Sequence, residues 1–303
     1  MTGDAEPPAA PADIRETLSV ELDAGPPGAR LLVPTGCGTP HDEVLAVSVE
    51  GGLVEGHATA PGLGLGALIV RPQGGRIAIR YAVGAPASPV YPEAAFEPRR
   101  TRYTVAADEL ASAVREIAAR TGGGEAGILA LVEDARSRFD YGHPDTRFND
   151  GADSVPFLAC GRTEGSCVDI NTYLVAGLRA AGYEAAYLYG YFFPAERGGI
   201  TNDMHCWVVT RHAGRVLEWD IAHHMKAGHS PVRPTLDPKP GRRVALGHSM
   251  GHRYRIGGEW IDVKLLAEPM WVRGGVATRA AGLLVTCRGE AARPARSRAD
   301  AAA

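Results

Sequence analysis

The hydrophobic pattern of this 303-residue chain changes its period near residue 106, and this change limits the possible folds. Before it, short apolar segments are bounded by Gly, Pro or Asp, which is typical of strands joined by turns. The last segment, RIAIRYAV, alternates so that Ile77, Ile79 and Tyr81 share one face. We therefore predict a small β-sandwich over residues 15–100. The segments are TLSVELD, ARLLVP, EVLAVSVE, GALIV and RIAIRYAV.

After residue 106 the apolar spacing becomes helical. The segments DELASAVREIAAR and EAGILALVEDARSRF predict two helices, and a third begins near Cys167, with Ile170, Leu174 and Leu178 at steps of four. Three predicted strands follow, so the pattern indicates an α+β domain over residues 101–288. These strands are YEAAYLYGYFF (183–193), HCWVVT (205–210) and RVLEWDIA (215–222).

The two ends of the chain have a different composition. Residues 1–14 are rich in Pro and Ala, and residues 289–303 read EAARPARSRADAAA from Glu290, so we expect both to be disordered. The start lacks a basic and apolar leader, and no apolar segment is long enough to span a bilayer. A net charge of -3 without basic runs argues against a nucleic-acid partner. We expect a cytoplasmic protein with no membrane partner, and the oligomeric state stays open.

The segment GHSMG, residues 247–251, fits the G-x-S-x-G elbow that exposes a nucleophilic serine. Such an elbow needs a following helix and a later histidine. The sequence after Ser249 has no helical stripe, and His252 lies within the same turn. A turn is therefore the better interpretation, and a serine hydrolase using Ser249 is a minor alternative.

Cys167 follows Gly165 and Ser166 at the start of the third helix. Unpaired N–H groups and the helix dipole favour a negative sulfur there, which lowers the pKa of the thiol. The same N–H groups could stabilise the oxyanion formed when a thiolate attacks a carbonyl. Asp169 in the first turn opposes the thiolate, so a neighbouring cation is needed.

His205 can supply that positive charge. On an alternating strand, His205 and Trp207 point to one face and Cys206 to the other. A histidine at a strand end beside a cysteine at a helix start is the arrangement of a Cys–His pair. On the next strand Glu218 or Asp220 could hold the imidazole, and spacing alone does not choose between them.

The order of these motifs resembles the transglutaminase-like superfamily of papain-related cysteine enzymes. The order is G-S-C at a helix start, a strand ending G-Y-F-F, H-C-W on a strand and W-D on the next. The resemblance runs from about Glu125 to His224 and includes the region of Tyr141. The preceding β-region is similar to the accessory domain of bacterial members.

The resemblance implies a catalytic triad of Cys167, His205 and Asp220. It favours Asp220 over Glu218 because the acid of the family follows the aromatic residue on that strand. Many relatives have a small residue such as Ala between the His and the Trp, where this chain has Cys206.

The expected activity is acyl transfer from a peptide, protein or small amide substrate. The cysteine forms a thioacyl-enzyme that water or an amine resolves, and no cofactor or metal is expected. Ser166, Trp207 and Tyr191 are the expected substrate contacts, although the two aromatic residues are also typical of core packing.

Two further alternatives concern other classes of function. A zinc site could draw on cysteine and histidine ligands, but their spacing lacks the usual close pairs. Its candidate ligands are Cys160, Cys167, His205, Cys206, His223 and His224. A binding module that has lost turnover is the other alternative. His223 and His224 are otherwise expected in a solvent-exposed turn.

Overall fold

A computed structural model describes residues 14–236 and 238–289 of the chain. The segments predicted to be disordered, residues 1–14 and 289–303, lie outside these ranges except for Ile14 and Gly289. These two residues are the first of one strand and the last of another.

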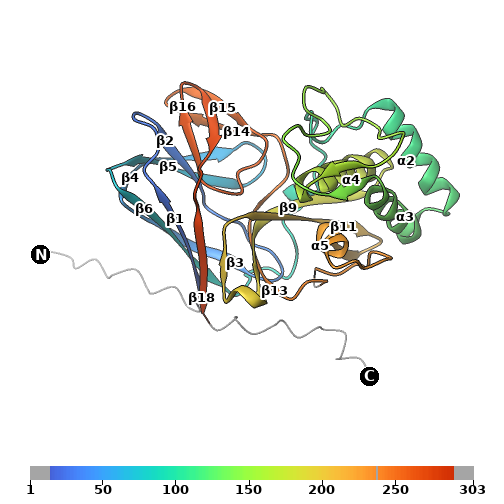
Figure 1. Cartoon of the computed structure of the whole chain (residues 1–303), viewed down its shortest axis with the longest axis horizontal. Helices are drawn as coiled ribbons and strands as arrows, with labels where there is room; N and C mark the ends of the chain where they lie inside the picture. Colours follow the sequence, from blue (N-terminus) through green and yellow to red (C-terminus); the bar gives the residue numbers. More distant parts are fainter. Residues whose placement is uncertain (1–13, 237, 290–303) are drawn as a thin grey trace, which may run out of the picture.

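The N-terminal half is built on two five-stranded antiparallel sheets (Figure 1). Alternate residues of the first sheet are buried, and Leu18 and Ile79 pack against Leu31 and Val70 of the second. The predicted sandwich strands are confirmed, and one more strand, β4, was missed. The first sheet has the order β10 (Ile200–Thr201), β18 (Leu284–Gly289), β1 (Ile14–Asp23), β6 (Arg76–Gly84), β3 (Glu43–Glu50). The second has the order β17 (Val276–Arg279), β16 (Met270–Arg273), β2 (Arg30–Pro34), β5 (Leu65–Pro72), β4 (Gly52–Ala60).

Strands from the end of the chain complete both sheets. β18 pairs with β1, with Leu18 opposite Cys287, and β16 pairs with β2. Residues on both sides of the predicted boundary between residues 100 and 101 therefore contribute strands to the same two sheets. The pairing of strands that are so far apart in the chain cannot be predicted from the local pattern of residues.

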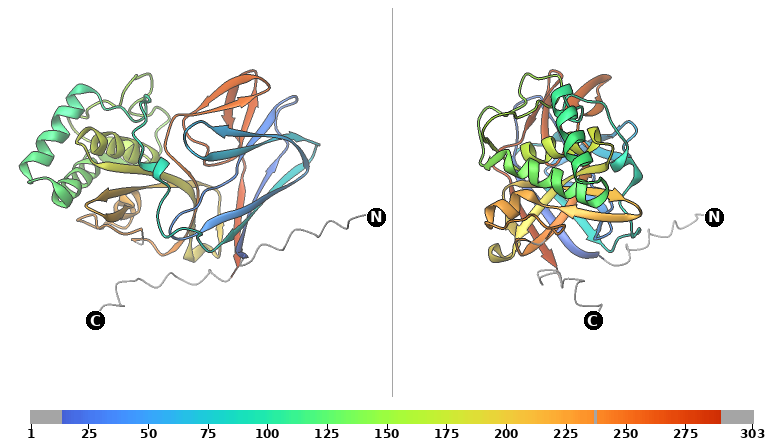
Figure 2. Two further views of the ribbon diagram at one scale, coloured as in Figure 1. Left: turned by 180° about the vertical axis from the view of Figure 1, so that it is seen from behind. Right: turned by 90° about the vertical axis from the view of Figure 1, so that its right-hand side faces the viewer.

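Helices α2, α3 and α4 lie together on the side of strand β9 (Glu184–Pro194) that is away from the sandwich (Figures 1 and 2), whereas α1 packs on the opposite face of the sheet. α2 and α3 cover α4, which is buried over most of its surface. The three predicted helices are confirmed. The helices are α1 (Glu93–Phe96), α2 (Asp108–Arg120), α3 (Gly124–Ser137), α4 (Cys167–Ala180) and α5 (Ile221–Lys226). In the described ranges no helix has both the length and the apolar character needed to cross a membrane.

A four-stranded sheet connects the helices to the sandwich. Its order is β12 (Arg215–Trp219), β11 (Met204–His212), β9 (Glu184–Pro194), β13 (Gly241–His248). Tyr187 and Val208 pack on α4, whereas Leu188 packs on the opposite face with Phe96 of α1. Farther along β9, Phe193 enters the sandwich core. This helix-covered antiparallel sheet confirms the predicted α+β class.

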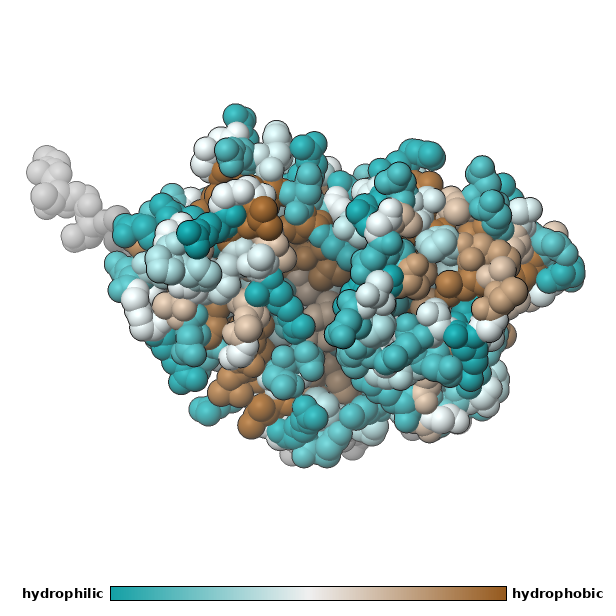
Figure 3. All heavy atoms as spheres, turned by 45° about the horizontal axis from the view of Figure 1, so that its top comes forward, coloured by the Kyte–Doolittle hydropathy of each residue, from teal (hydrophilic) through white to brown (hydrophobic). Residues whose placement is uncertain are grey.

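Smaller elements complete the fold. β7 (Phe139–Tyr141) and β8 (Thr163–Gly165) form a parallel pair, and β14 (His252–Ile256) and β15 (Glu259–Val263) form a hairpin. A 3-10 turn covers Ala195–Arg197. Hydrophilic residues cover most of the face in Figure 3, and apolar residues gather in the depression between the two halves.

Candidate active site

Strand β8 ends at Gly165, and α4 begins two residues later with Cys167 as its first helical residue. Gly165 is required there because a Cβ would lie 2.6 Å from the Phe139 ring. The Asp169 carboxylate accepts from the backbone N–H of Ser166 at 2.9 Å and from its hydroxyl at 2.7 Å. Arg147 pairs with the same carboxylate at 2.7 Å. These partners largely neutralise the negative charge of Asp169, which was expected to disfavour a thiolate at Cys167.

His205 lies near the start of β11 and contacts both other members of the proposed triad. Its Nε2 lies 2.8 Å from Oδ2 of Asp220, which leaves Nδ1 for the side of Cys167. All three residues are buried, with Cys167 5% and His205 4% exposed. The structure thus brings together the three residues that the sequence predicted.

The charges of this group favour an ion pair. Hydrogen bonds from Cys206 and His205 hold the pKa of Cys167 well below its ordinary value, against the opposing effect of burial. Burial lowers the pKa of His205, but Asp220 and Cys167 outweigh it and raise that pKa to about 9. A thiolate beside an imidazolium at neutral pH is the activated form of a nucleophilic cysteine.

Geometry distinguishes Asp220 from Glu218. The Glu218 carboxylate accepts from the Tyr91 hydroxyl and lies 2.5 Å from Nε2 of His41, on the sandwich side of the sheet. The predicted strand over residues 215–222 is too long, because β12 ends at Trp219 and α5 begins at Ile221. Asp220 lies at this turn, where its carboxylate faces His205 and also caps α5.

Two further side chains surround Asp220: Arg243, which sequence reasoning missed, and His223, which it placed in a solvent-exposed turn or a zinc site. Nη2 of Arg243 lies 2.5 Å from Oδ2, and Nδ1 of His223 lies 2.8 Å from the same oxygen. The His223 ring also stacks on His205, with centroids 4.1 Å apart. Nδ1 of His223 lies 3.1 Å from the same guanidinium nitrogen of Arg243. Because a guanidinium only donates, Nδ1 either donates to Asp220 or accepts from Arg243.

His223 and His224 are buried in α5, so their predicted placement in a solvent-exposed turn is wrong. The reason is that α5 packs against α3 and α4. Burial lowers the pKa of His223 to about 4, so the imidazole is neutral at physiological pH.

Three of these groups also have the spacing of a metal site. Ligand atoms of His205, Asp220 and His223 lie within 4.8 Å of one another. However, the buried guanidinium of Arg243 contacts the same carboxylate oxygen and would repel a cation. Cys160, another ligand of the zinc alternative, is exposed. The donor set therefore fits a hydrogen-bond network better than a metal site.

The predicted substrate contacts need correction. Tyr191 is fully buried in the sandwich core, and Trp207 is buried in the cluster around α1 and β9. The Ser166 hydroxyl donates to Asp169 and is 3% exposed as a residue. The two aromatic side chains therefore pack in clusters other than that of Cys167, and the Ser166 hydroxyl is used to hold Asp169.

Tyr141 and Lys226 lie on the exposed side of the site. Nζ of Lys226 lies 4.2 Å from the centroid of the Tyr141 ring. Burial and then the charge on Cys167 raise the pKa of Tyr141, whereas burial lowers the pKa of Lys226 against the opposing effect of Cys167. Lys226 had no recognisable sequence signal, because its position depends on where α5 begins.

Ser249 lies in a turn with φ 66° and is 2% exposed. Its hydroxyl lies 3.0 Å from Nδ1 of His248, and β14 follows instead of a helix. The absence of the helical stripe was predicted correctly. Because the elbow requires a helix after the serine and a strand follows instead, the structure favours the turn interpretation.

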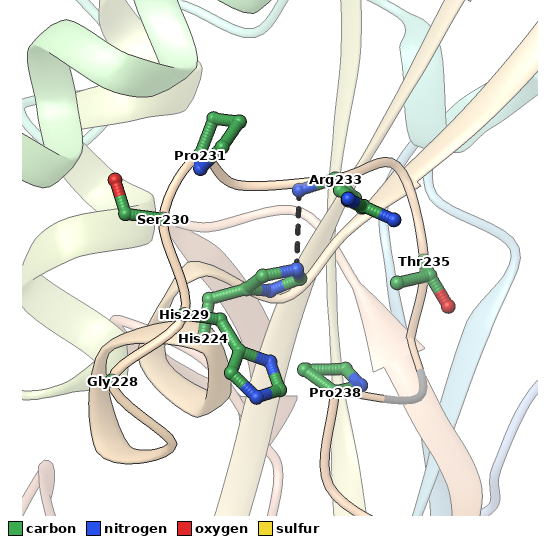
Figure 4. A pocket seen from close by; sticks show the side chains of 8 residues that line it. All are labelled: His224, Gly228, His229, Ser230, Pro231, Arg233, Thr235 and Pro238. Carbon is green, nitrogen blue, oxygen red and sulfur yellow. Dashed lines mark hydrogen bonds between the residues drawn. The ribbon is translucent and has the colours of Figure 1, made fainter.

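A cavity of about 460 Å³ lies beside α5 (Figure 4). His224 forms part of its wall, where Nδ1 donates to the Asp220 carbonyl and Nε2 accepts from the backbone N–H of Arg233. Cys167 is not among the described residues that line this cavity. They are His224, Gly228, His229, Ser230, Pro231, Arg233, Thr235 and Pro238.

Comparisons with known proteins concern the family and the fold. Residues 111–219 match the model of the transglutaminase-like superfamily, and no curated protein matches the chain significantly in sequence. A solved protein from Cytophaga hutchinsonii, described as a candidate cysteine protease, has a TM-score of 0.57 at 14% identity, covering 91% of each chain. The periplasmic domain of TgpA from Pseudomonas aeruginosa has a TM-score of 0.36 at 18% identity, covering 72% of this chain and 90% of that one. Residues 111–219 are thus similar to the transglutaminase-like superfamily, and the chain shares its fold with the Cytophaga protein.

Proposed function

We propose that this protein is a cysteine-dependent acyl-transfer enzyme that acts on an amide substrate. The observation that carries the proposal is the buried contact of His205 with Asp220 beside Cys167 at a helix start. The family match and the Cytophaga likeness support the same chemistry.

In the proposed reaction the Cys167 thiolate attacks the amide carbonyl. The backbone N–H of Cys167, at the N-terminus of α4, helps to stabilise the resulting oxyanion. His205, which already holds the thiol proton, gives it to the leaving amine, while Asp220 keeps the ring oriented. Water or a second amine then resolves the thioacyl-enzyme, giving hydrolysis or transfer. This scheme uses no cofactor.

Alkylation with iodoacetamide tests the activated cysteine without a known substrate. We expect Cys167 to react faster at neutral pH than Cys160, Cys37 or Cys287, as read by peptide mass spectrometry. Cys160 is the most stringent comparison, because its side chain is exposed and iodoacetamide can reach it without hindrance. If Cys167 reacts no faster than Cys160, and His205→Ala changes nothing, the proposed nucleophile is wrong.

A substrate screen separates an enzyme from a binding module. Peptide amides are incubated with the protein in the presence of hydroxylamine, which converts a thioacyl-enzyme into a hydroxamate. Hydroxamate formation that Cys167→Ala abolishes supports acyl transfer. Peptide binding without hydroxamate or hydrolysis, by a protein whose Cys167 is reactive, supports the binding module.

A further inference from the structure

Cys206 separates His205 from Trp207, and its side chain faces α4. The Asn171 side-chain amide donates to the Cys206 carbonyl at 3.0 Å and to its sulfur at 3.4 Å. Asn171 lies one turn after Cys167 on α4, so the two cysteines approach each other from a helix and a strand that are packed together. Both belong to one buried cluster, and Cys206 is 0% exposed.

The two sulfurs are hydrogen-bond partners of unequal acidity. Cys206 makes a side-chain hydrogen bond with Cys167, and this bond contributes most to the lowered pKa of Cys167. Burial first, and then the contact with Cys167, raise the pKa of Cys206 well above its ordinary value. Cys206 is therefore the protonated partner of a thiolate.

We propose that Cys167 and Cys206 form a reversible oxidation site in which Cys206 captures the oxidised Cys167 as an intramolecular disulfide. The oxidant is a hydroperoxide. The proposal rests on the Cys167 thiolate of the proposed function, because only a thiolate reacts readily with a peroxide.

The chemistry is balanced in two steps. The Cys167 sulfur attacks a peroxide oxygen, the O–O bond breaks, and the released alkoxide or hydroxide takes a proton, leaving a sulfenic acid. The Cys206 sulfur then attacks the Cys167 sulfur, the S–O bond breaks, and the departing hydroxide leaves as water with the Cys206 proton. The thiol pair loses two electrons, and the hydroperoxide gains them.

Oxidation itself removes one obstacle to the second step. The negative charge on Cys167 is one cause that raises the pKa of Cys206. A sulfenic acid is uncharged, so this repulsion ends when Cys167 is oxidised. The other cysteines lie elsewhere, because Cys37 and Cys287 border the sandwich clusters and Cys160 is exposed.

The test uses the full chain, hydrogen peroxide and mass spectrometry, so it needs no substrate. After peroxide treatment, unfolding and blocking with N-ethylmaleimide, we expect the protein to carry two fewer maleimides than the reduced protein, and digestion should give a crosslinked peptide pair containing residues 167 and 206. Dithiothreitol should restore both thiols. Cys206→Ser, which keeps a hydrogen-bond donor at this position but cannot form a disulfide, should instead accumulate several-fold more dimedone adduct and sulfinic acid at Cys167.

Cys287→Ala is the matched control and should keep the disulfide. Circular dichroism of each variant before oxidation shows whether it is folded, and the serine variant retains a side chain of nearly the same size. If wild type accumulates as much sulfinic acid as Cys206→Ser, or if Cys167 pairs with another cysteine, the proposal is wrong. If peroxide does not oxidise Cys167 in any variant, the thiolate of the proposed function is wrong as well, and the iodoacetamide result shows this independently.

Discussion

Arg243 and Asp220 form a buried ion pair directly behind the proposed catalytic histidine. The guanidinium lies 2.5 Å from Oδ2 of Asp220, and their side chains are 7% and 0% exposed. The same oxygen faces His205 at 2.8 Å. Burial opposes the charge on Asp220, but His205 and Arg243 hold the pKa of this carboxyl well below its ordinary value. Arg243 thus fixes the group that orients the imidazole.

Replacing Arg243 with Met should destabilise the protein strongly. Breaking a buried pair from one side leaves an incompletely compensated charge, so we expect a loss of about 3–5 kcal/mol in the free energy of unfolding. Urea unfolding measures this loss. Arg253→Met is the control, because Arg253 pairs with Asp262 on the surface, with side chains 55% and 74% exposed. The control should lose less than about 1 kcal/mol. Similar losses in both variants would contradict the assigned role of Arg243.

Asp220→Asn and Glu218→Gln should differ sharply in their effect on Cys167. Asp220 raises the pKa of His205, whereas Glu218 contacts His41 and Tyr91. Without the carboxylate the pKa of His205 falls, so the imidazolium that stabilises the Cys167 thiolate is less populated. The pH midpoint of Cys167 alkylation should therefore rise in Asp220→Asn. Once a substrate is known, turnover should fall by about 10²–10⁴-fold. Glu218→Gln should leave the midpoint unchanged, and an equal shift in both variants would reopen the choice of acid.

Buried histidines make the protein sensitive to acid. Burial lowers the pKa values of His223, His248 and His252 to about 4 in the folded state, from 6.5. Below pH 6.5 the unfolded chain therefore binds more protons, so stability falls as the pH drops from 6.5 toward 4. At pH 5 each group should cost up to about 2 kcal/mol relative to pH 7.5. Urea unfolding at the two pH values measures the sum.

Two glutamine variants test this prediction. His252→Gln keeps a donor but does not titrate, so the difference in stability between pH 7.5 and pH 5 should shrink. His229→Gln removes an exposed histidine and should leave the difference as in wild type. An unchanged difference in His252→Gln would show that other groups cause the acid sensitivity.

The sequence predicted the features that depend on local residue patterns and missed those that depend on contacts between distant segments. Helix periodicity located α4, and alternation placed Cys206 on the face away from His205, which in the structure is the face that packs on α4. Long-range pairing has no such signal, so the joining of β18 to β1 was missed. Arg243 was missed for the same reason, because its contact with Asp220 depends on β13 pairing beside β9. Tyr191 was misassigned because β9 extends beyond the catalytic sheet into the sandwich core.

Gly165→Ala should disturb the placement of Cys167. The added Cβ would lie 2.6 Å from the Phe139 ring, so the ring or β8 must move. Overpacking of this kind costs about 1–3 kcal/mol, and here it also shifts the start of α4. We expect lower stability and slower alkylation of Cys167. Gly56→Ala is the control, since nothing lies within 4 Å of its added Cβ. Alkylation at the wild-type rate in Gly165→Ala would show that the approach of β8 to Phe139 is not needed.

Ser249→Ala should leave the chemistry intact. The Ser249 hydroxyl is buried against His248, and its removal should cost at most about 1 kcal/mol of stability. The rate and pH dependence of Cys167 alkylation should match wild type, whereas Cys167→Ser should lose all labelling at position 167. A fluorophosphonate probe distinguishes the two nucleophiles, because it labels activated serines. Labelling of Ser249, or loss of amide turnover in Ser249→Ala without loss of stability, would reinstate the serine. The expected absence of both follows from context, because Ser249 fits the sequence pattern but is followed by a strand instead of the helix that the elbow requires.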